Sequence, residues 1–184
     1  MPMVAQTLVD RCVVGEADAW RELHMELHPV VVSFLRRLGV PPSEADDLGQ
    51  DVFLELFRHL RKFEGRSDIK TWVYRLCVTQ AGRLRRASWF ARTFPWLPSA
   101  TRNEEPQPTA GDSLPEDDMR CRIQEALARM KPLHRNVMVL YEFEGLSGEQ
   151  IAEVLACPVA TVWRRLHHAR REFTTLVKER EWVT

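Results

Sequence analysis

Residues 147–173 read SGEQIAEVLACPVATVWRRLHHARREF, and their pattern decides the fold of the C-terminal part of the chain. Ser147 is a predicted N-cap, because its hydroxyl can accept a hydrogen bond from the first turn of a helix. The helix that it opens is short and amphipathic, with an inward side made of Ile151, Ala152 and Leu155. A tight turn at 156–158 follows, and a second helix begins near Val159. Helix, three-residue turn and helix together predict a helix-turn-helix unit.

The second helix of this unit has an apolar side and a basic side. Steps of four, three and four residues predict one buried stripe through Val162, Leu166, Ala169 and Phe173. The opposite face carries Arg164, His167, His168 and Arg171, and it is flanked near its N-terminal end by Thr161 and Arg165. Such a face suits the major groove of DNA, where an arginine bonded to guanine contributes about 1–3 kcal/mol of discrimination.

Two features of this helix leave alternatives open. A basic outer face can be plain solvated surface, although its combination with a short helix and a tight turn favours DNA binding. Trp163 can pack on the rim of the unit or lie against the sugar-phosphate backbone.

Helical periodicity extends over two blocks, and strand signals are nearly absent. The first block covers about 4–88. Inside it, Pro29 predicts a kinked or split helix, and Ser43 with Asp46 predicts a capping box that opens the next helix. Residues 65–68 read as a short loop before another long helix.

The second block covers about 116–184, with helix stops at 131–132, 145–147 and 157–158. An extended linker at 89–115 is predicted from Pro95, Pro98, Pro106, Pro108 and Pro115. The predicted fold is therefore all-α, with two small helical domains at 1–88 and 116–184 joined by a proline-rich linker. The second domain contains the helix-turn-helix.

Overall charge and cysteine usage exclude several classes of protein. The formal net charge of +0 argues against a chain that simply coats nucleic acid. Basic residues nevertheless gather in two runs, Arg83, Arg85, Arg86 and Arg92, and Arg164, Arg165, Arg170 and Arg171. Acids occupy the stretch between them: Glu104, Glu105, Asp112, Glu116, Asp117 and Asp118.

No apolar stretch is long enough to span a bilayer, and the N-terminus lacks the layout of a secretory signal, so a cytoplasmic protein without membrane insertion is expected. The cysteines are widely scattered, which predicts reduced thiols and no metal site: Cys12, Cys77, Cys121 and Cys157.

In the first block, the helix at 43–62 has an unusually apolar outer face. Its inward stripe is Ala45, Leu48, Val52, Leu56 and Leu60. The opposite face holds Asp47, Gln50, Asp51, Leu54, Phe57 and Arg58. Large apolar groups beside carboxylates and an amide indicate a protein-docking patch, although scattered exposed apolar residues also occur without function.

The helix that begins near Ile69 presents arginines among small residues. Its inward stripe is Ile69, Trp72, Val73, Leu76, Cys77, Gln80 and Leu84. The predicted outward face is Thr71, Arg75, Val78, Thr79, Gly82, Arg85 and Arg86. This face leaves room for a phosphate backbone or an extruded base, and the alternative is a cationic, solvated helix end.

Several segments in this order resemble one protein family. In the first block they are 45–53 (ADDLGQDVF), 63–68 (FEGRSD) and 71–76 (TWVYRL) followed by Arg85-Arg86; in the second they are 140–155 and 160–166 (ATVWRRL) followed by Ala169-Arg170. Together they resemble the extracytoplasmic-function (ECF) sigma factors, the minimal two-domain sigma factors of bacterial RNA polymerase. Thr79 and Arg83 depart from the pattern, because the family often has Asn and Asp there.

The resemblance implies a promoter-recognition subunit, responsive to stress or a signal, that uses no cofactor and leaves the chemistry to the polymerase. Its partners would be core RNA polymerase, promoter DNA as duplex and as melted strand, and an anti-sigma factor. The linker would thread through polymerase channels.

The same resemblance implies three sets of site residues. Core polymerase would bind Asp47, Leu48, Gln50, Asp51 and Phe53, to which the outer face adds Leu54 and Phe57. The minus-ten element would be captured and melted by Phe63, Arg66, Ser67, Asp68, Lys70, Thr71, Trp72, Arg75, Thr79, Arg85 and Arg86. The minus-thirty-five element would be read by Thr161, Trp163, Arg164, Arg165, His168 and Arg171.

Two other classes of function compete with this one. A stand-alone helix-turn-helix regulator that binds duplex DNA without polymerase explains the second block but leaves Gln50, Leu54 and Phe57 without a role. An enzyme is disfavoured, because no known nucleophile motif or metal motif is present. His24 and His28 lie four apart on a helix, but two ligands do not make a metal site.

Overall fold

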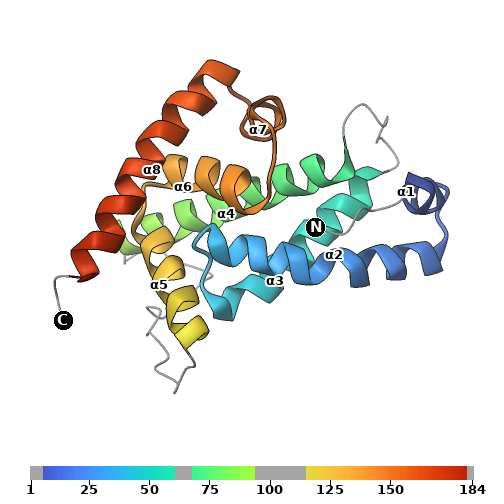
Figure 1. The fold of residues 1–184 in the computed structure, drawn as a ribbon. Helices are drawn as coiled ribbons and strands as arrows, with labels where there is room; N and C mark the ends of the chain where they lie inside the picture. The colour runs from blue at the N-terminus through green and yellow to red at the C-terminus, as the bar shows by residue number, and fades with distance from the viewer. Residues whose placement is uncertain (1–5, 61–67, 94–114, 182–184) are drawn as a thin grey trace.

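The computed structural model describes residues 6–60, 68–93 and 115–181, and within these ranges the chain is helical, with no strand (Figure 1). The helices are α1 (Gln6–Val13), α2 (Ala17–Arg37), α3 (Pro42–His59), α4 (Ile69–Thr93), α5 (Pro115–Arg129), α6 (Pro132–Met138), α7 (Gly148–Leu155) and α8 (Val159–Glu181). A π-helical segment, η2 (Val139–Phe143), extends α6. We refer to α1–α4 as the first lobe and to α5–α8 as the second lobe. The predicted all-α fold is confirmed.

The first lobe is built around α2, which packs against α1, α3 and α4. Leu23, Leu27 and Phe34 of α2 are fully buried and meet the predicted inward stripe of α3. α2 runs unbroken through Pro29, so the prediction that its helix splits there is wrong. Pro29 lies on the exposed side of α2, where the carbonyl group that loses its amide partner can face water.

The start of α3 differs from the predicted capping box. Pro41 is the N-cap, Pro42 stands in the first turn, and no side chain caps the helix. Proline suits this place, because its fixed φ matches a helix and its missing N–H would have had no partner there. Ser43 therefore lies inside the helix, and its predicted capping role is wrong.

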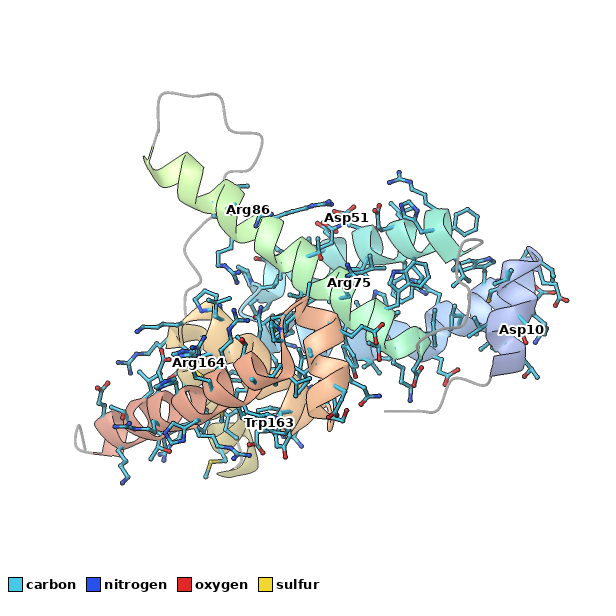
Figure 2. The ribbon with its side chains drawn as sticks, turned by 90° about the horizontal axis from the view of Figure 1, so that it is seen from above. Asp10, Asp51, Arg75, Arg86, Trp163 and Arg164 are labelled. Atoms are coloured by element: carbon cyan, nitrogen blue, oxygen red, sulfur yellow. The ribbon has the colours of Figure 1, made fainter. Side chains whose placement is uncertain are left out.

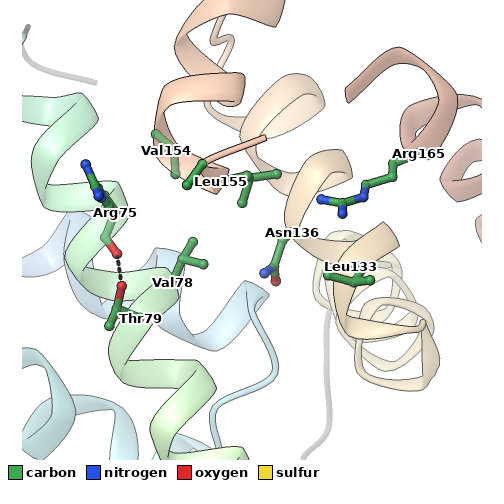
Figure 3. Close-up of a pocket in the computed structure, with 9 residues that line it drawn as sticks. Arg75, Val78, Thr79, Leu133, Asn136, Val154, Leu155 and Arg165 are labelled. Atoms are coloured by element: carbon green, nitrogen blue, oxygen red, sulfur yellow. Dashed lines mark hydrogen bonds between the residues drawn. The ribbon is translucent and has the colours of Figure 1, made fainter. Parts of the chain in front are cut away.

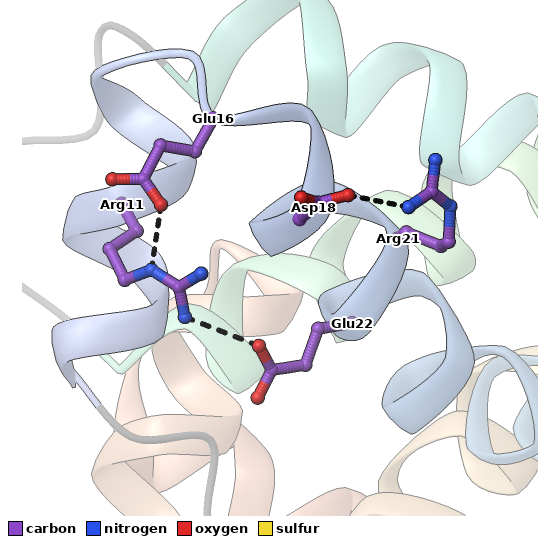
Figure 4. Close-up of polar contacts among 5 residues, drawn as sticks. All are labelled: Arg11, Glu16, Asp18, Arg21 and Glu22. Carbon is purple, nitrogen blue, oxygen red and sulfur yellow. Dashed lines mark hydrogen bonds and ion pairs between the residues drawn. The ribbon is translucent and has the colours of Figure 1, made fainter.

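A polar corner ties α1 to the beginning of α2 (Figure 4). Arg11 donates from Nε to Glu16 Oε2 at 2.8 Å and from Nη1 to Glu22 Oε2 at 3.2 Å. All three side chains are about half exposed, so these ion pairs add little to stability and mainly orient α1. The apolar side of α1 is anchored by Leu8, Val9 and Cys12, which are buried.

In the second lobe, the predicted helix-turn-helix is formed by α7 and α8. Ser147 caps α7 as predicted: its Oγ accepts from the backbone N–H of Gln150, and the Gln150 side chain accepts from the backbone N–H of Ser147. α7 ends at Ala156, which has φ +47 and is the one non-glycine residue with positive φ in the described ranges. The reversal of direction at this residue aims α8 across α6, its main packing partner.

The two lobes lie against each other in the computed structure, with α4 beside α7 and α2 beside α5. α4 continues to Thr93, so the predicted start of the linker at residue 89 is too early. The remainder of that linker, 94–114, falls outside the described residues. None of the described helices is both long and apolar enough to cross a membrane.

Candidate nucleic-acid and protein interfaces

The outer face of α8 is positioned by the predicted buried stripe. Val162, Leu166 and Ala169 are buried, and Phe173 is partly buried. The opposite side is exposed at Arg164, His167, His168 and Arg171. Figure 2 shows Arg164 on this helix, with Trp163 beside it. The arrangement gives α8 a basic outer surface of the kind that enters a major groove.

Trp163 packs on the rim of the helix-turn-helix, one of the two predicted alternatives. It is 45% exposed, and its ring meets that of Tyr141 edge-on at a centroid distance of 5.6 Å. Its other neighbour is Gly148: a Cβ at that position would lie 2.6 Å from Trp163 Cζ2. The missing side chain at Gly148 is thus what lets the indole approach the start of α7 this closely.

Arg165 and Thr161 are less accessible than the rest of the α8 face. Both are partly buried. Arg165 Nη1 lies 3.7 Å from Cys157 Sγ, as a weak hydrogen bond, and the guanidinium points toward α6 (Figure 3). In this arrangement Arg165 is turned toward the first lobe.

The outer face of α3 is exposed where the mixed apolar and acidic patch was predicted. Leu54 is 52% exposed and Phe57 is 58% exposed, and Asp47, Gln50 and Asp51 lie on the surface beside them. Leu48 and Phe53 differ from these five, because they are 9% and 8% exposed and belong to the core. Their contribution to any docking is through packing.

Three side chains of α2 continue the α3 patch, and the sequence pattern did not assign them to it. Trp20 meets Phe57 edge-on at 4.9 Å, and the rings of His24 and His28 lie 4.5 Å and 6.0 Å from that of Phe53. Burial, and the neighbouring His28, lower the pKa of His24. In the described part of the chain, no group of three or more His, Cys, Asp or Glu residues could hold a metal ion.

Along α4, the predicted outward arginines are exposed. Arg75, Arg85 and Arg86 lie on the surface, with Arg75 and Arg86 labelled along this helix in Figure 2. Partial burial and the neighbouring Arg86 lower the pKa of Arg85. Thr79 is exposed too, but its Oγ1 donates to Arg75 O at 2.8 Å, so its only hydroxyl proton is used within the helix.

The beginning of α4 corrects the prediction at one residue. Asp68 Oδ1 accepts from the Lys70 backbone N–H at 3.0 Å and satisfies a first-turn amide. Trp72 is partly buried. Thr71 is only 4% exposed, so its predicted outward orientation is wrong. The proposed minus-ten residues Phe63, Arg66 and Ser67 lie outside the described residues.

α4 is buried along two stripes, where one was predicted. The predicted stripe includes Val73 and Cys77, and burial raises the pKa of the Cys77 thiol. The second stripe steps through Thr71, Tyr74, Val78 and Gly82, all buried or partly buried. A helix with two buried sides packs against two bodies, and the second body is α7 of the second lobe.

Comparison with known proteins decides the family. A family model for sigma-70 region 2 matches residues 23–90, and a model for sigma-70, region 4, matches residues 122–173. The chain is also 28% identical over 183 residues to the ECF RNA polymerase sigma-E factor of Escherichia coli strain K12, covering 94% of both chains. The chain is an ECF sigma factor of the sigma-70 family. The region 2 match spans α2 to α4 of the sigma factor, and the region 4 match spans most of the second lobe.

Solved structures agree with the fold of this sigma factor. CnrH, in a complex with the cytosolic domain of CnrY, superposes with a TM-score of 0.70 at 21% identity, covering 94% of this chain and 96% of that one. The sigma factor RpoE of Bartonella quintana, in a complex with the anti-sigma factor NepR, gives 0.66 at 21% identity, covering 86% and 96%. Both likenesses support the all-α architecture in two helical domains.

Proposed function

We propose that this sigma factor docks on core RNA polymerase through the outer face of α3, extended by Trp20 of α2. The observation that carries this proposal is the exposure of Leu54 and Phe57 beside Asp47, Gln50 and Asp51. Aromatic and aliphatic side chains framed by acids form a central apolar anchor with a polar rim, which is the composition of a protein interface. A regulator that binds DNA alone has no use for such a face.

The DNA-reading roles belong to the two basic helices. Arg75, Thr79, Arg85 and Arg86 of α4 would hold the separated minus-ten strand, after the segment with Phe63, Arg66 and Ser67 traps an extruded base. Asp68, Lys70 and Trp72 would support that capture from the start of α4. Extruding a base costs a few kcal/mol, so cationic and stacking contacts must return that energy.

The outer face of α8 would read the minus-thirty-five duplex through Arg164, Arg165, His168 and Arg171, with Thr161 and Trp163 at its edge. An arginine that bonds guanine bidentately discriminates by about 1–3 kcal/mol, or roughly tenfold or more in affinity. The sigma factor would act in the cytoplasm with no catalytic activity of its own. It would be silenced by an anti-sigma factor, as the Bartonella quintana sigma factor RpoE is found bound to one.

A pair of variants separates docking from DNA reading. Replacing Gln50 and Leu54 together, by Ala and Arg, places a charge at the centre of the proposed anchor. Association with immobilised core polymerase should weaken at least tenfold, because a central interface side chain is lost. The matched control is Arg164→Glu, which should keep polymerase association and lose promoter selection in transcription assays. Docking through α3 is refuted if the double variant binds core polymerase as tightly as the wild type.

A further inference from the structure

A cavity lies where α4 meets the second lobe, and α6, α7 and the first part of α8 form its other sides (Figure 3). Its volume is about 290 Å³, near the lower end of the range of about 300–1,000 Å³ found for small-molecule pockets. Apolar side chains form one part of its lining, and polar side chains form another. That combination is typical of a site for a small organic molecule.

The apolar part of the lining comes from three helices. Val78 of α4 and Leu155 of α7 are partly buried, and Val154 of α7 is buried. Leu133 of α6 is 58% exposed, so the cavity opens to solvent beside it. A ligand can therefore enter from solution and bury an apolar group against these side chains.

Asn136 of α6 is the buried polar group of the lining. It is only 7% exposed, and its Oδ1 has no hydrogen-bond partner among the described residues. Figure 3 shows its carboxamide between Val78 and Arg165. A buried amide oxygen without a partner is unfavourable, so it needs a hydrogen bond from a molecule inside the cavity. Water or a ligand can supply that bond.

The charge around the cavity is positive. Arg75 and Arg165 lie on opposite sides of Asn136 in Figure 3, and none of the described residues that line the cavity is an Asp or a Glu. Neither guanidinium pairs with a carboxylate elsewhere in the described part of the chain, and Arg165 has only its weak contact with Cys157 Sγ at 3.7 Å. Both arginines are thus available to an anion.

Hydrogen bonds between the lobes fix the sides of the cavity to each other. Glu144, which follows η2, accepts from Arg37 Nη1 at 3.0 Å and from the Tyr74 hydroxyl at 2.5 Å. Its side chain is only 5% exposed. Arg37 and Tyr74 belong to the first lobe, while Asn136 and Arg165 belong to the second. The cavity is therefore present before a ligand enters, which lowers the cost of binding.

Three properties of the lining define the ligand. The forked guanidinium of Arg165 matches a carboxylate, which it can bind through two hydrogen bonds. The Asn136 carboxamide calls for a hydroxyl, because a hydroxyl donates to the oxygen and also accepts from the nitrogen when the amide is turned over. An ammonium group in place of that hydroxyl would be repelled by two guanidinium groups that no acid of the lining offsets.

We propose that this cavity binds a small 2-hydroxycarboxylic acid with an apolar side chain, whose carboxylate pairs with Arg165 and whose hydroxyl bonds Asn136. In such an acid the two polar groups are on neighbouring carbon atoms. This suits the Arg165 guanidinium, which points toward α6, the helix of Asn136. The site does not depend on the proposed function, because binding is measured without DNA and without polymerase.

Three probes with one carbon skeleton test the class of ligand on the full chain. They are 3-phenyllactate, 3-phenylpropionate, which lacks the hydroxyl, and phenylalanine, which has an ammonium group in its place. Calorimetric titration should give a dissociation constant below about 1 mM for 3-phenyllactate, which is ordinary for a ligand of this size. The other two probes should bind about tenfold more weakly. Absence of saturable 3-phenyllactate binding, equal affinity for the three probes, or equally tight binding of inorganic phosphate would overturn the proposal.

A pair of arginine variants locates the acid group of the ligand. Arg165→Gln should weaken 3-phenyllactate binding at least tenfold, because the carboxylate loses its partner. The matched control is Arg164→Gln, which removes the same charge from an exposed residue that is not among the described residues lining the cavity. This control should keep the wild-type affinity. Equal losses in both variants would refute the site, because general positive charge would then account for the binding.

Asn136→Leu tests the contact with the hydroxyl. Its affinity for 3-phenyllactate should fall about tenfold, to that for 3-phenylpropionate, so the preference for the hydroxyl disappears. The unbound variant should resist urea at least as well as the wild type, because an unpaired buried amide is gone. A retained preference for 3-phenyllactate would contradict the role of Asn136. If this variant does not fold, the comparison of the three probes on the wild type still decides.

Discussion

Replacing Glu172 by alanine should destabilise the second lobe more than replacing any of the exposed charged side chains of α8. The first turn of α6 has no side-chain cap of its own, because its N-cap is Lys131. Glu172 of α8 supplies the missing acceptor: its Oε1 accepts from the Lys131 backbone N–H at 2.8 Å, and its Oε2 bonds His134 Nδ1. One carboxylate thereby fixes α6 and α8 to each other.

The expected cost is about 2 kcal/mol. An N-cap contributes about 0.5–2 kcal/mol, and a hydrogen bond to a charged group contributes about 1.5–3 kcal/mol. The two values describe partly the same hydrogen bonds of Glu172, so they do not add. The Glu172 side chain is 21% exposed, so solvent weakens these bonds only in part. For a chain of this length, about 2 kcal/mol lowers Tm by roughly 4–8 °C.

The pH dependence of this cost identifies its origin. Burial by itself would raise the pKa of Glu172, but the hydrogen bonds from His134 and from the Lys131 backbone outweigh it and hold the pKa below its ordinary value. A carboxyl with a lowered pKa stabilises the fold above its unfolded value of about 4.3, and this stability is lost as the pH falls through the folded value. The difference between wild type and Glu172→Ala should therefore be full at neutral pH and shrink below about pH 4.

Urea unfolding followed by circular dichroism at several pH values measures the difference. The control is Glu179→Ala, which removes an α8 carboxylate paired with Arg129 Nη2 at 2.9 Å, with both side chains about half exposed. That change should cost less than about 0.5 kcal/mol. The reasoning is refuted if Glu172→Ala costs no more than Glu179→Ala, or if its cost is the same in acid as at neutral pH.

Four other changes give sharp expectations. Ser147→Ala removes the cap of α7 and should lower the free energy of unfolding by about 1 kcal/mol; a change under about 0.3 kcal/mol would contradict the capping role. Ala156→Gly relieves a left-handed alanine and should stabilise the protein by about 0.5–1 kcal/mol in the same unfolding assay, whereas destabilisation would argue against strain at the turn. Gly148→Ala should displace the Trp163 ring, seen as a shifted indole N–H resonance in NMR spectra; an unmoved resonance would mean that the close contact does not exist. Thr79→Asn should change the preference at the opened base in a promoter selection, and an unchanged profile would show that this position does not read it.

Much of the second lobe could be predicted because its signals are local. Ser147 and Gln150 stand three residues apart just before an apolar run, which is what a capping box requires, and the structure forms it. The same pattern failed at Ser43, because Pro42 takes the first turn and the helix starts without a side-chain cap. A proline with fixed φ competed with the serine, and it occupies the earlier position.

The contact between the lobes could not be predicted, because its partners are far apart in the chain. Glu144 is separated by 107 residues from Arg37 and by 70 from Tyr74. The second buried stripe of α4, with Thr71 and Gly82, lacks the apolar contrast that periodicity detects. The exposed apolar patch of α3 was predictable for the opposite reason, since Leu54 and Phe57 break the pattern expected of a solvated helix side.

The most direct test of the account is transcription in vitro with purified core polymerase, free of any other initiation subunit and of inhibitors, on a library of promoter templates. The wild type should start transcripts from a defined subset of templates, and Arg164→Glu should lose that selectivity while still binding the polymerase. The account says that both helical lobes recognise one promoter while core polymerase carries out the chemistry. If the wild type starts no transcript from any template, this account is wrong.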